Sequence, residues 1–223
     1  MAAVSALFWA ALYAVVLWTG WAAAWAPGAP ARPGAGRPPW ATLAALLVVG
    51  VPSLLQLTVA PGLLGALQRT PTELADGQLW RLVTSLVVQD GGWPGAVFNL
   101  AALAVVGATA EQVWGPRRWL VVWAGAGVGA QLWGLLVQPT GAGNSVATFG
   151  LAASVSVLAL RRGRGVSRLC GSASLLAGLA LLVMGDVHGG AVVLGALAGL
   201  LLTRVPASDP AGGRSVPSDP TTP

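Results

Sequence analysis

Seven long apolar runs, separated by short polar segments, constrain this chain more than any other feature. The runs cover about residues 3–25, 41–59, 94–112, 118–138, 145–160, 170–184 and 188–203. A helix that crosses a bilayer needs roughly 20 apolar residues, and lipid forces every backbone polar group to pair within the helix. The sequence therefore predicts an all-α polytopic membrane protein in which these runs are transmembrane helices.

Composition and charge agree with this class and exclude several functions. The chain is 55% hydrophobic and only 9% charged, which is unusual for a soluble domain. Its basic residues are all arginines in short loops, and they form no basic face interleaved with aromatic residues. Cys170 is the only cysteine and His188 the only histidine, so neither a disulfide nor an ordinary zinc site is expected. We expect no nucleic-acid partner, no metal and no cofactor.

The chain divides into four segments. Residues 1–26 are predicted as an N-terminal transmembrane helix, 27–40 as a semi-rigid linker rich in Pro, Gly and Ala, 41–204 as a six-helix core, and 205–223 as a disordered cytoplasmic tail. The small residues before Pro27 resemble the cleavage site of a secretory signal. However, this run has no preceding arginine and is longer than a usual signal core, which favours a retained helix.

The arginines predict how the chain crosses the membrane. On a path of seven helices, most of them fall on one side: Arg32, Arg37, Arg117, Arg118, Arg161, Arg162, Arg164, Arg168, Arg204 and Arg214. Arg69 and Arg81 lie on the other side, in the long segment 60–93. Because cytoplasmic loops carry an excess of arginine, we expect the N-terminus outside and the C-terminus in the cytoplasm. The residue usage is typical of a GC-rich bacterial genome, which favours a bacterial plasma membrane.

Ser145 and His188 stand near the starts of two apolar runs that both begin at the outer face in this topology. On the run of His188, the small residues Ala191, Gly195 and Gly199 recur every four positions. Such a stripe lets another helix backbone approach closely. The two side chains are therefore predicted to lie at similar depth on neighbouring helices.

These polar residues have structural and chemical interpretations. A serine hydroxyl becomes a nucleophile when a neutral imidazole accepts its proton, and an N–H near a helix start can stabilise the oxyanion. The backbone N–H of Ser145 and the side chain of Asn99 are the candidate donors. Alternatively, Ser145 is a helix N-cap, His188 a loop-end histidine and Asn99 an interhelical hydrogen-bonding residue.

Five sequence features, in this order, resemble the rhomboid family of intramembrane serine proteases. They are the Trp80–Arg81 pair, the segment ending in Asn99, the turn with Glu111 and Gly115, Gly143-x-Ser145, and His188 with its small-residue stripe. The resemblance covers about residues 41–204 and implies a rhomboid-like six-helix bundle with one extra N-terminal transmembrane helix. It also implies that Trp80 and Arg81 shape an outer loop partly sunk in lipid.

The resemblance also implies roles for the polar residues. Ser145 would be the nucleophile and His188 its general base, in a dyad that needs no aspartate. Asn99 and the N–H of Ser145 would bind the oxyanion, and Phe149 would stack on the imidazole. Asp186 is expected only to cap the last helix. The implied activity is hydrolysis of peptide bonds in or near transmembrane segments of other membrane proteins, surrounded by lipid and without a cofactor.

Three positions depart from the family pattern. Val146 replaces a glycine after the serine, Gly95 stands where the family has a histidine one turn before Asn99, and Gln89 replaces an outer-loop histidine. These departures motivate an alternative, an inactive rhomboid-like protein that binds membrane clients. A transporter is disfavoured because the apolar runs contain almost no charges. The substrate, the cleavage site and the oligomeric state stay open.

Overall fold

The computed structural model describes residues 2–204, and within them the chain is built from helices. The predicted tail 205–223 lies outside the described residues. The helices are α1 (Ala2–Ala23), α2 (Trp40–Thr58), α3 (Gly62–Leu67), α4 (Pro71–Ala75), α5 (Arg81–Thr84), α6 (Gly92–Ala102), the π-helical turn η1 (Leu103–Gly107), α7 (Ala108–Trp114), α8 (Pro116–Val137), α9 (Ser145–Arg162), α10 (Gly165–Val183) and α11 (Val187–Arg204). All seven apolar runs are helical, although α10 begins before the run predicted for it.

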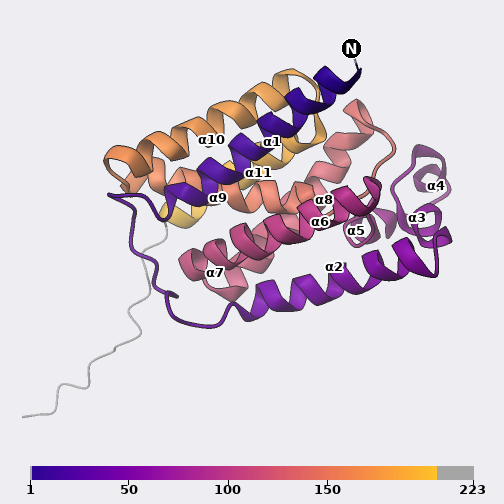
Figure 1. Ribbon diagram of the computed structural model, residues 1–223, viewed down its shortest axis with the longest axis horizontal. Helices are drawn as coiled ribbons and strands as arrows, with labels where there is room; N and C mark the ends of the chain where they lie inside the picture. Colours follow the sequence, from indigo (N-terminus) through magenta and orange to yellow (C-terminus); the bar gives the residue numbers. More distant parts are fainter. Residues whose placement is uncertain (1, 205–223) are drawn as a thin grey trace, which may run out of the picture.

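The helices form a polytopic membrane bundle, as predicted. Among the described residues, five helical stretches are long and apolar enough to cross a membrane: Trp40–Thr58, Gly92–Trp114, Pro116–Val137, Gly165–Val183 and Val187–Arg204. A shorter apolar helix covers Leu7–Ala23. In Figure 1, α1 lies along α10 on one side of the bundle, α2 lies on the opposite side, and α3, α4 and α5 gather at one end.

Helix α9 occupies the centre of the bundle. Every residue from Val146 to Ala159 is buried, and α9 packs against α1, α8, α10 and α11. Because protein rather than lipid surrounds it, α9 tolerates hydroxyl groups that find partners inside the bundle. Ser156 Oγ donates to Ala152 O at 2.8 Å, and Trp114 Nε1 donates to Ser154 Oγ at 3.0 Å. This explains why α9 is more polar than the helices that surround it.

Small residues set the close approach of α11 to α9, which confirms the predicted stripe. A methyl group added at Gly195 would overlap the backbone of Gly150, and one at Gly199 would lie 2.7 Å from Ser154 O. Ala191 is fully buried in the same stripe. Backbones this close leave no room for a side chain between the two helices. The stripe therefore determines how near the starts of α9 and α11 lie.

The predicted linker packs on the end of the bundle where the arginine-rich loops meet. Gly34 N donates to Gln112 O at 2.8 Å, and Arg164 N donates to Gly28 O at 2.9 Å. Arg32 reinforces this contact, because its guanidinium donates to Gln112 Oε1 at 3.0 Å. The segment therefore follows the core surface and joins α1 to α2 in a defined path.

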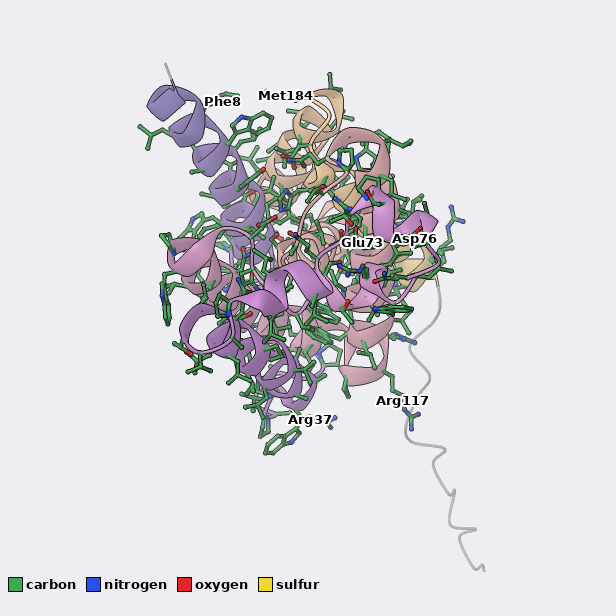
Figure 2. All side chains as sticks on the ribbon, turned by 90° about the vertical axis from the view of Figure 1, so that its right-hand side faces the viewer. Phe8, Arg37, Glu73, Asp76, Arg117 and Met184 are labelled. Carbon is green, nitrogen blue, oxygen red and sulfur yellow. The ribbon has the colours of Figure 1, made fainter. Side chains whose placement is uncertain are left out.

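The opposite end carries α3, α4 and α5, and Figure 2 views the bundle from this end, with the labelled Glu73 and Asp76. Arg81 is buried there and donates to the carbonyl oxygens of Gly65 at 2.8 Å and Gln68 at 2.9 Å. Trp80 beside it is 56% exposed. Arg81 thus organises the loop segment from inside while Trp80 faces outward.

Candidate active site

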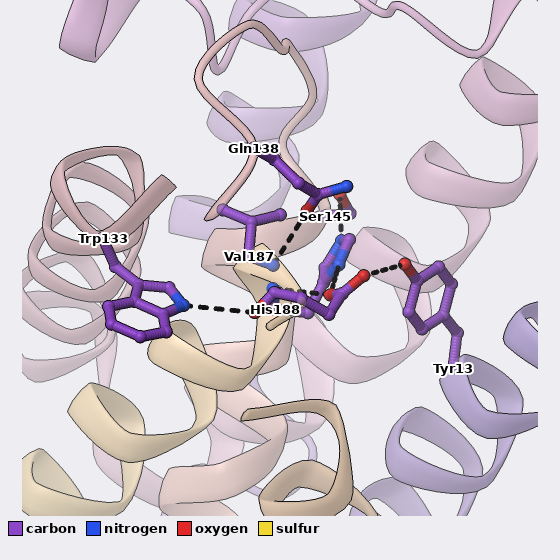
Figure 3. Close-up of polar contacts among 7 residues, drawn as sticks. Tyr13, Trp133, Gln138, Ser145, Val187 and His188 are labelled. Atoms are coloured by element: carbon purple, nitrogen blue, oxygen red, sulfur yellow. Dashed lines mark hydrogen bonds and ion pairs between the residues drawn. The ribbon is translucent and has the colours of Figure 1, made fainter. Parts of the chain in front are cut away.

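Ser145 and His188 come together at the starts of α9 and α11. The Nε2 atom of His188 lies 2.9 Å from Ser145 Oγ, and Figure 3 shows this contact together with its neighbours. His188 is 9% exposed. The two residues are far apart in sequence, and the close packing of their helices brings them to one point. This distance is within hydrogen-bond range for an O–H donor and an imidazole acceptor.

Ser145 is the first residue of α9 rather than its N-cap, so the capping alternative does not describe it. Asn144 holds the N-cap position, and no side chain caps this helix start. The Ser145 hydroxyl contacts the imidazole instead. The first N–H groups of a helix have no carbonyl partner within it. The start of α9 therefore places a hydroxyl and free backbone donors side by side.

Asp186 lies against the other side of the imidazole, which corrects the expectation that it only caps the helix. Its Oδ1 accepts from His188 N at 2.8 Å, as a cap does, and also lies 2.7 Å from His188 Nδ1. The physical reason is local. The Asp186 carboxylate caps the start of α11 by accepting from the backbone N–H of His188, two residues later. At that position it also reaches the ring of the same histidine.

The environment of Asp186 favours its charged form. Burial alone would raise the pKa of Asp186, but hydrogen bonds from His188 and Tyr13 outweigh it and hold that pKa below its ordinary value. Trp133 Nε1 on α8 donates to Asp186 O at 3.2 Å. Gln138 Oε1 accepts from Val187 N at 2.9 Å. The turn that carries the carboxylate is thus held from the α8 side as well (Figure 3).

Two aromatic rings contact the imidazole of His188. Phe149 on α9 lies 4.5 Å from it between ring centroids, with the planes inclined by 46°. The ring is therefore in contact, as the resemblance implied, but tilted rather than parallel. Tyr13 on α1 lies at the same centroid distance, with an inclination of 50°. The imidazole consequently sits between one ring from the core and one from the N-terminal helix.

Asn99 and Gln89 border the space in front of Ser145. A methyl group at Gly143 would lie 3.3 Å from Asn99 Nδ2, 3.4 Å from Gln89 Oε1 and 3.5 Å from Ser145 Oγ. Asn99 Nδ2 donates to Gln89 Oε1 at 2.7 Å. Gln89 is almost fully buried, and its Nε2 donates to Asn144 Oδ1 at 3.1 Å. A primary amide has two N–H donors, so Asn99 keeps one for a ligand in this space.

A cavity of about 380 Å³ opens in front of Ser145, and several of these residues line it. It is lined by Ser145 and His188, by Asn99 and Gly95 of α6, and by Tyr13 of α1. A methyl group at Gly95 would meet nothing within 4 Å. Val146 also lines the cavity but is itself 3% exposed. The cavity therefore brings the Ser145–His188 pair together with side chains of α6 and α1.

Arg69 fixes the loop that leads to Ser145. Although the sequence placed it in an outer loop, it is 1% exposed. Its side chain donates to Pro139 O and Gln131 O, both at 3.1 Å, and also to Gln138 O. Its backbone pairs with Gly141 in both directions at 3.1 Å. Burial lowers the pKa of Arg69, and the charge of Asp90 opposes this effect.

Sequence reasoning assigned no role beside the Ser145–His188 pair to three residues, Asp186, Tyr13 and Arg69. Asp186 offered a signal, because an acidic residue two positions before the only histidine can both cap and orient it. Tyr13 offered only its uniqueness, since it is the sole tyrosine and lies in a different part of the chain. Arg69 looked like an ordinary loop cation. Their burial and their hydrogen-bond partners distinguish these three residues from ordinary loop and helix residues. Both properties depend on how the helices pack.

Of the comparisons with known proteins, the one with family models found a match. Residues 76–207 match a family model described as Rhomboid domain, which is more than half of the chain. Neither the curated proteins nor the solved structures contain a match to the chain. The matched region includes Asn99, Ser145, Asp186 and His188, whereas Tyr13 lies outside it.

Proposed function

The chain belongs to the rhomboid family, a family of intramembrane proteases, and on this premise we propose that it is a serine endopeptidase of membrane proteins. The observation that carries the proposal is the 2.9 Å separation of Ser145 Oγ and His188 Nε2. In a chain with one histidine, this places the only imidazole base on a hydroxyl at a helix start. A general base within hydrogen-bond reach is the usual means of activating serine.

The geometry supports a two-step acyl transfer. Ser145 Oγ attacks the scissile carbonyl carbon while His188 Nε2 takes the hydroxyl proton, and the same nitrogen then returns that proton to the leaving amine. In the second step, water attacks the carbonyl carbon of the acyl group while His188 Nε2 takes its proton. The same nitrogen then gives that proton to Ser145 Oγ, which releases the acyl group as a carboxylic acid. Asp186 holds Nδ1 at 2.7 Å and thereby favours the tautomer with Nε2 free. The aspartate orients the base and exchanges no proton.

The developing oxyanion is bound in front of the start of α9. The backbone N–H of Ser145 and the second N–H of Asn99 are its proposed donors. Asn99 borders the space at Gly143, where an added methyl group would lie 3.3 Å from Asn99 Nδ2 and 3.5 Å from Ser145 Oγ. Donors fixed before the reaction stabilise charge more effectively than mobile water does.

The substrates proposed for this site are transmembrane segments of other proteins. A peptide bond inside a helix is shielded by its own hydrogen bonds, so the segment must unwind near the cut. Helix-weakening residues such as Gly and Pro, and other small residues, are therefore expected there. By the arginine distribution, the site lies toward the outer face of a bacterial plasma membrane, with the C-terminus in the cytoplasm.

Labelling with a fluorophosphonate tests the proposal without knowledge of the substrate. Purified wild-type protein is expected to take one phosphonyl group, and peptide mass spectrometry should place it on Ser145. An activated hydroxyl is required because an ordinary serine reacts very slowly. A folded protein that stays unlabelled would contradict the proposal and favour the client-binding alternative.

A second function, an inactive client-binding protein, has one specific observation in its favour. Gln89 Oε1 accepts the hydrogen bond from Asn99 Nδ2, so the proposed oxyanion donor is already engaged in part. Under this alternative, Ser145→Ala would leave every cellular effect of the protein unchanged. Under proteolysis, the same substitution removes that effect.

A histidine at Gly95 is expected to accelerate the reaction. Gly95 lies one helical turn before Asn99, lines the cavity and has open space at its Cβ position. One oxyanion donor is typically worth about 10²–10³ in rate, and we expect Gly95→His to raise the labelling rate by about tenfold because its geometry is not optimised. The rate of fluorophosphonate adduct formation measures this.

The matched control is Gly65→His, because Gly65 also has open space at Cβ and does not line the cavity. This variant should label at the wild-type rate. An unchanged rate in folded Gly95→His would show that this position does not face the oxyanion.

A further inference from the structure

The N-terminal helix contributes a side chain to the catalytic group. Tyr13 Oη donates to Asp186 Oδ2 at 2.6 Å, across 173 positions of sequence. Figure 3 shows Tyr13 of α1 and Trp133 of α8 on opposite sides of His188. The family match begins at residue 76 and so does not include α1. This contact therefore joins a residue outside the matched region to one inside it.

The hydroxyl of Tyr13 completes the hydrogen bonding of the Asp186 carboxylate. Oδ1 faces the backbone N–H and Nδ1 of His188 at 2.8 and 2.7 Å, and Oδ2 accepts from Tyr13. With both oxygens held, the carboxylate cannot turn about its Cβ–Cγ bond without breaking a short hydrogen bond. Hydrogen bonds to a charged acceptor are stronger than those between neutral groups.

The ring of Tyr13 also limits the movement of the imidazole. It lies 4.5 Å from the ring of His188 and meets Phe149 edge-on at 5.5 Å and 88°. Edge-to-face aromatic pairs of this kind are favourable. The imidazole is thus confined between two rings that contact each other.

Close packing of α1 makes the position of Tyr13 specific. Ser174 Oγ of α10 donates to Val16 O at 2.8 Å, and Ser167 Oγ donates to Ala23 O at 2.6 Å. A methyl group at Gly20 would lie 3.0 Å from Ala152 Cβ on α9. Val16 is fully buried. These contacts fix both the depth and the rotation of α1, and hence the point that Tyr13 reaches.

We propose that Tyr13 is a positioning residue of the active site: its hydroxyl holds Asp186 so that His188 Nδ1 keeps its proton and Nε2 stays free to accept that of Ser145. This inference rests on the proposed function. It makes α1 a part of the catalytic unit rather than an added anchor. The hydroxyl of Tyr13 acts through Asp186 rather than on the hydroxyl of Ser145.

The test is Tyr13→Phe, which keeps the ring and removes only the hydroxyl. We expect the fluorophosphonate labelling rate to fall about 10- to 100-fold, as for loss of one hydrogen bond to a charged group. The chain has one histidine, so nitrogen NMR of histidine-labelled protein reports on His188 alone. In alkaline buffer, the population protonated at Nδ1 should fall toward that of free imidazole.

A general loss of stability is separated by the control Val49→Ala. Val49 is fully buried on α2 and does not line the cavity, so this variant should lower the unfolding temperature and leave the tautomer population as in the wild type. A folded Tyr13→Phe protein with a wild-type histidine spectrum would overturn the inference. If wild-type protein takes no label but the spectrum changes in Tyr13→Phe, Tyr13 positions His188 and the proposed hydrolysis is what fails.

Discussion

Alanine at Ser145 or at His188 is expected to lower the rate of fluorophosphonate labelling and of proteolysis by about 10⁴–10⁶-fold. The first change removes the attacking oxygen, and the second removes the only imidazole in the chain. Because Ser145 Oγ and His188 Nε2 lie 2.9 Å apart and are proposed to act as one unit, the double variant should lose little more than either single one. Initial rates of adduct formation and adduct mass measure all three variants.

The control for this prediction is Ser156→Ala. Ser156 lies on the same helix and is buried, but its hydroxyl donates to Ala152 O within α9. Its removal should change the labelling rate by no more than about twofold. Near-wild-type labelling of Ser145→Ala at another serine would show that the reactive hydroxyl is elsewhere, and the proposed nucleophile would then be wrong.

Leucine at Gly195 is expected to prevent formation of the native bundle. A methyl group alone would overlap the backbone of Gly150, so Gly195→Ala already requires α9 and α11 to separate. Overpacking of this kind costs about 1–3 kcal/mol and sometimes more, and the three further carbons of leucine add to it. The alanine variant should unfold several degrees lower, while the leucine variant should aggregate or lose its near-ultraviolet circular dichroism in detergent.

Gly125→Leu is the matched control for this substitution. Gly125 is exposed on α8 and has nothing within 4 Å of its Cβ position, so a leucine there should project from the bundle. We expect its unfolding temperature to stay within about two degrees of the wild type. A Gly195→Leu protein that folds and labels normally would contradict the close contact of α9 and α11.

The proposed catalysis and the stability of the bundle both depend on this contact. Gly195 lies two turns after His188 on α11, and Gly150 lies near the start of α9, which Ser145 begins. Any separation of the two helices also separates the base from the hydroxyl. We therefore expect Gly195→Ala to lose labelling rate by a larger factor than a destabilisation remote from this interface, such as Val49→Ala on α2.

The membrane class followed from the sequence because a spanning helix has to be apolar over most of its length. Runs such as 41–59 and 118–138 predicted α2 and α8 almost to the residue. The run at 145–160 was also predicted as a helix, but its burial among other helices could not be predicted from the run itself. It is buried from Val146 to Ala159, and hydroxyl-bearing residues are tolerated there only because other helices cover them.

The candidate site was predictable in part. Ser145 and His188 could be paired because both precede helices that start from the same face, and the small stripe on α11 indicated contact. Asp186 was predicted as a helix cap, but its contact with His188 Nδ1 was not predicted. A capping position does not reveal which ring atom the carboxylate reaches. Gln89 was noted as a departure, although its burial and its hydrogen bond to Asn99 could not be anticipated.

By itself, the sequence determined that this protein is embedded in a membrane, that it is helical, that it resembles the rhomboid family, and that Ser145 and His188 form a candidate pair. These properties depend on local composition, on the spacing of small residues and on features that lie within one helix or loop. Only the tertiary structure decided that Tyr13 meets Asp186 and that Arg69 lies under the loop before Ser145. Those contacts join segments far apart in the chain, so their geometry depends on how closely the helices pack rather than on any local pattern.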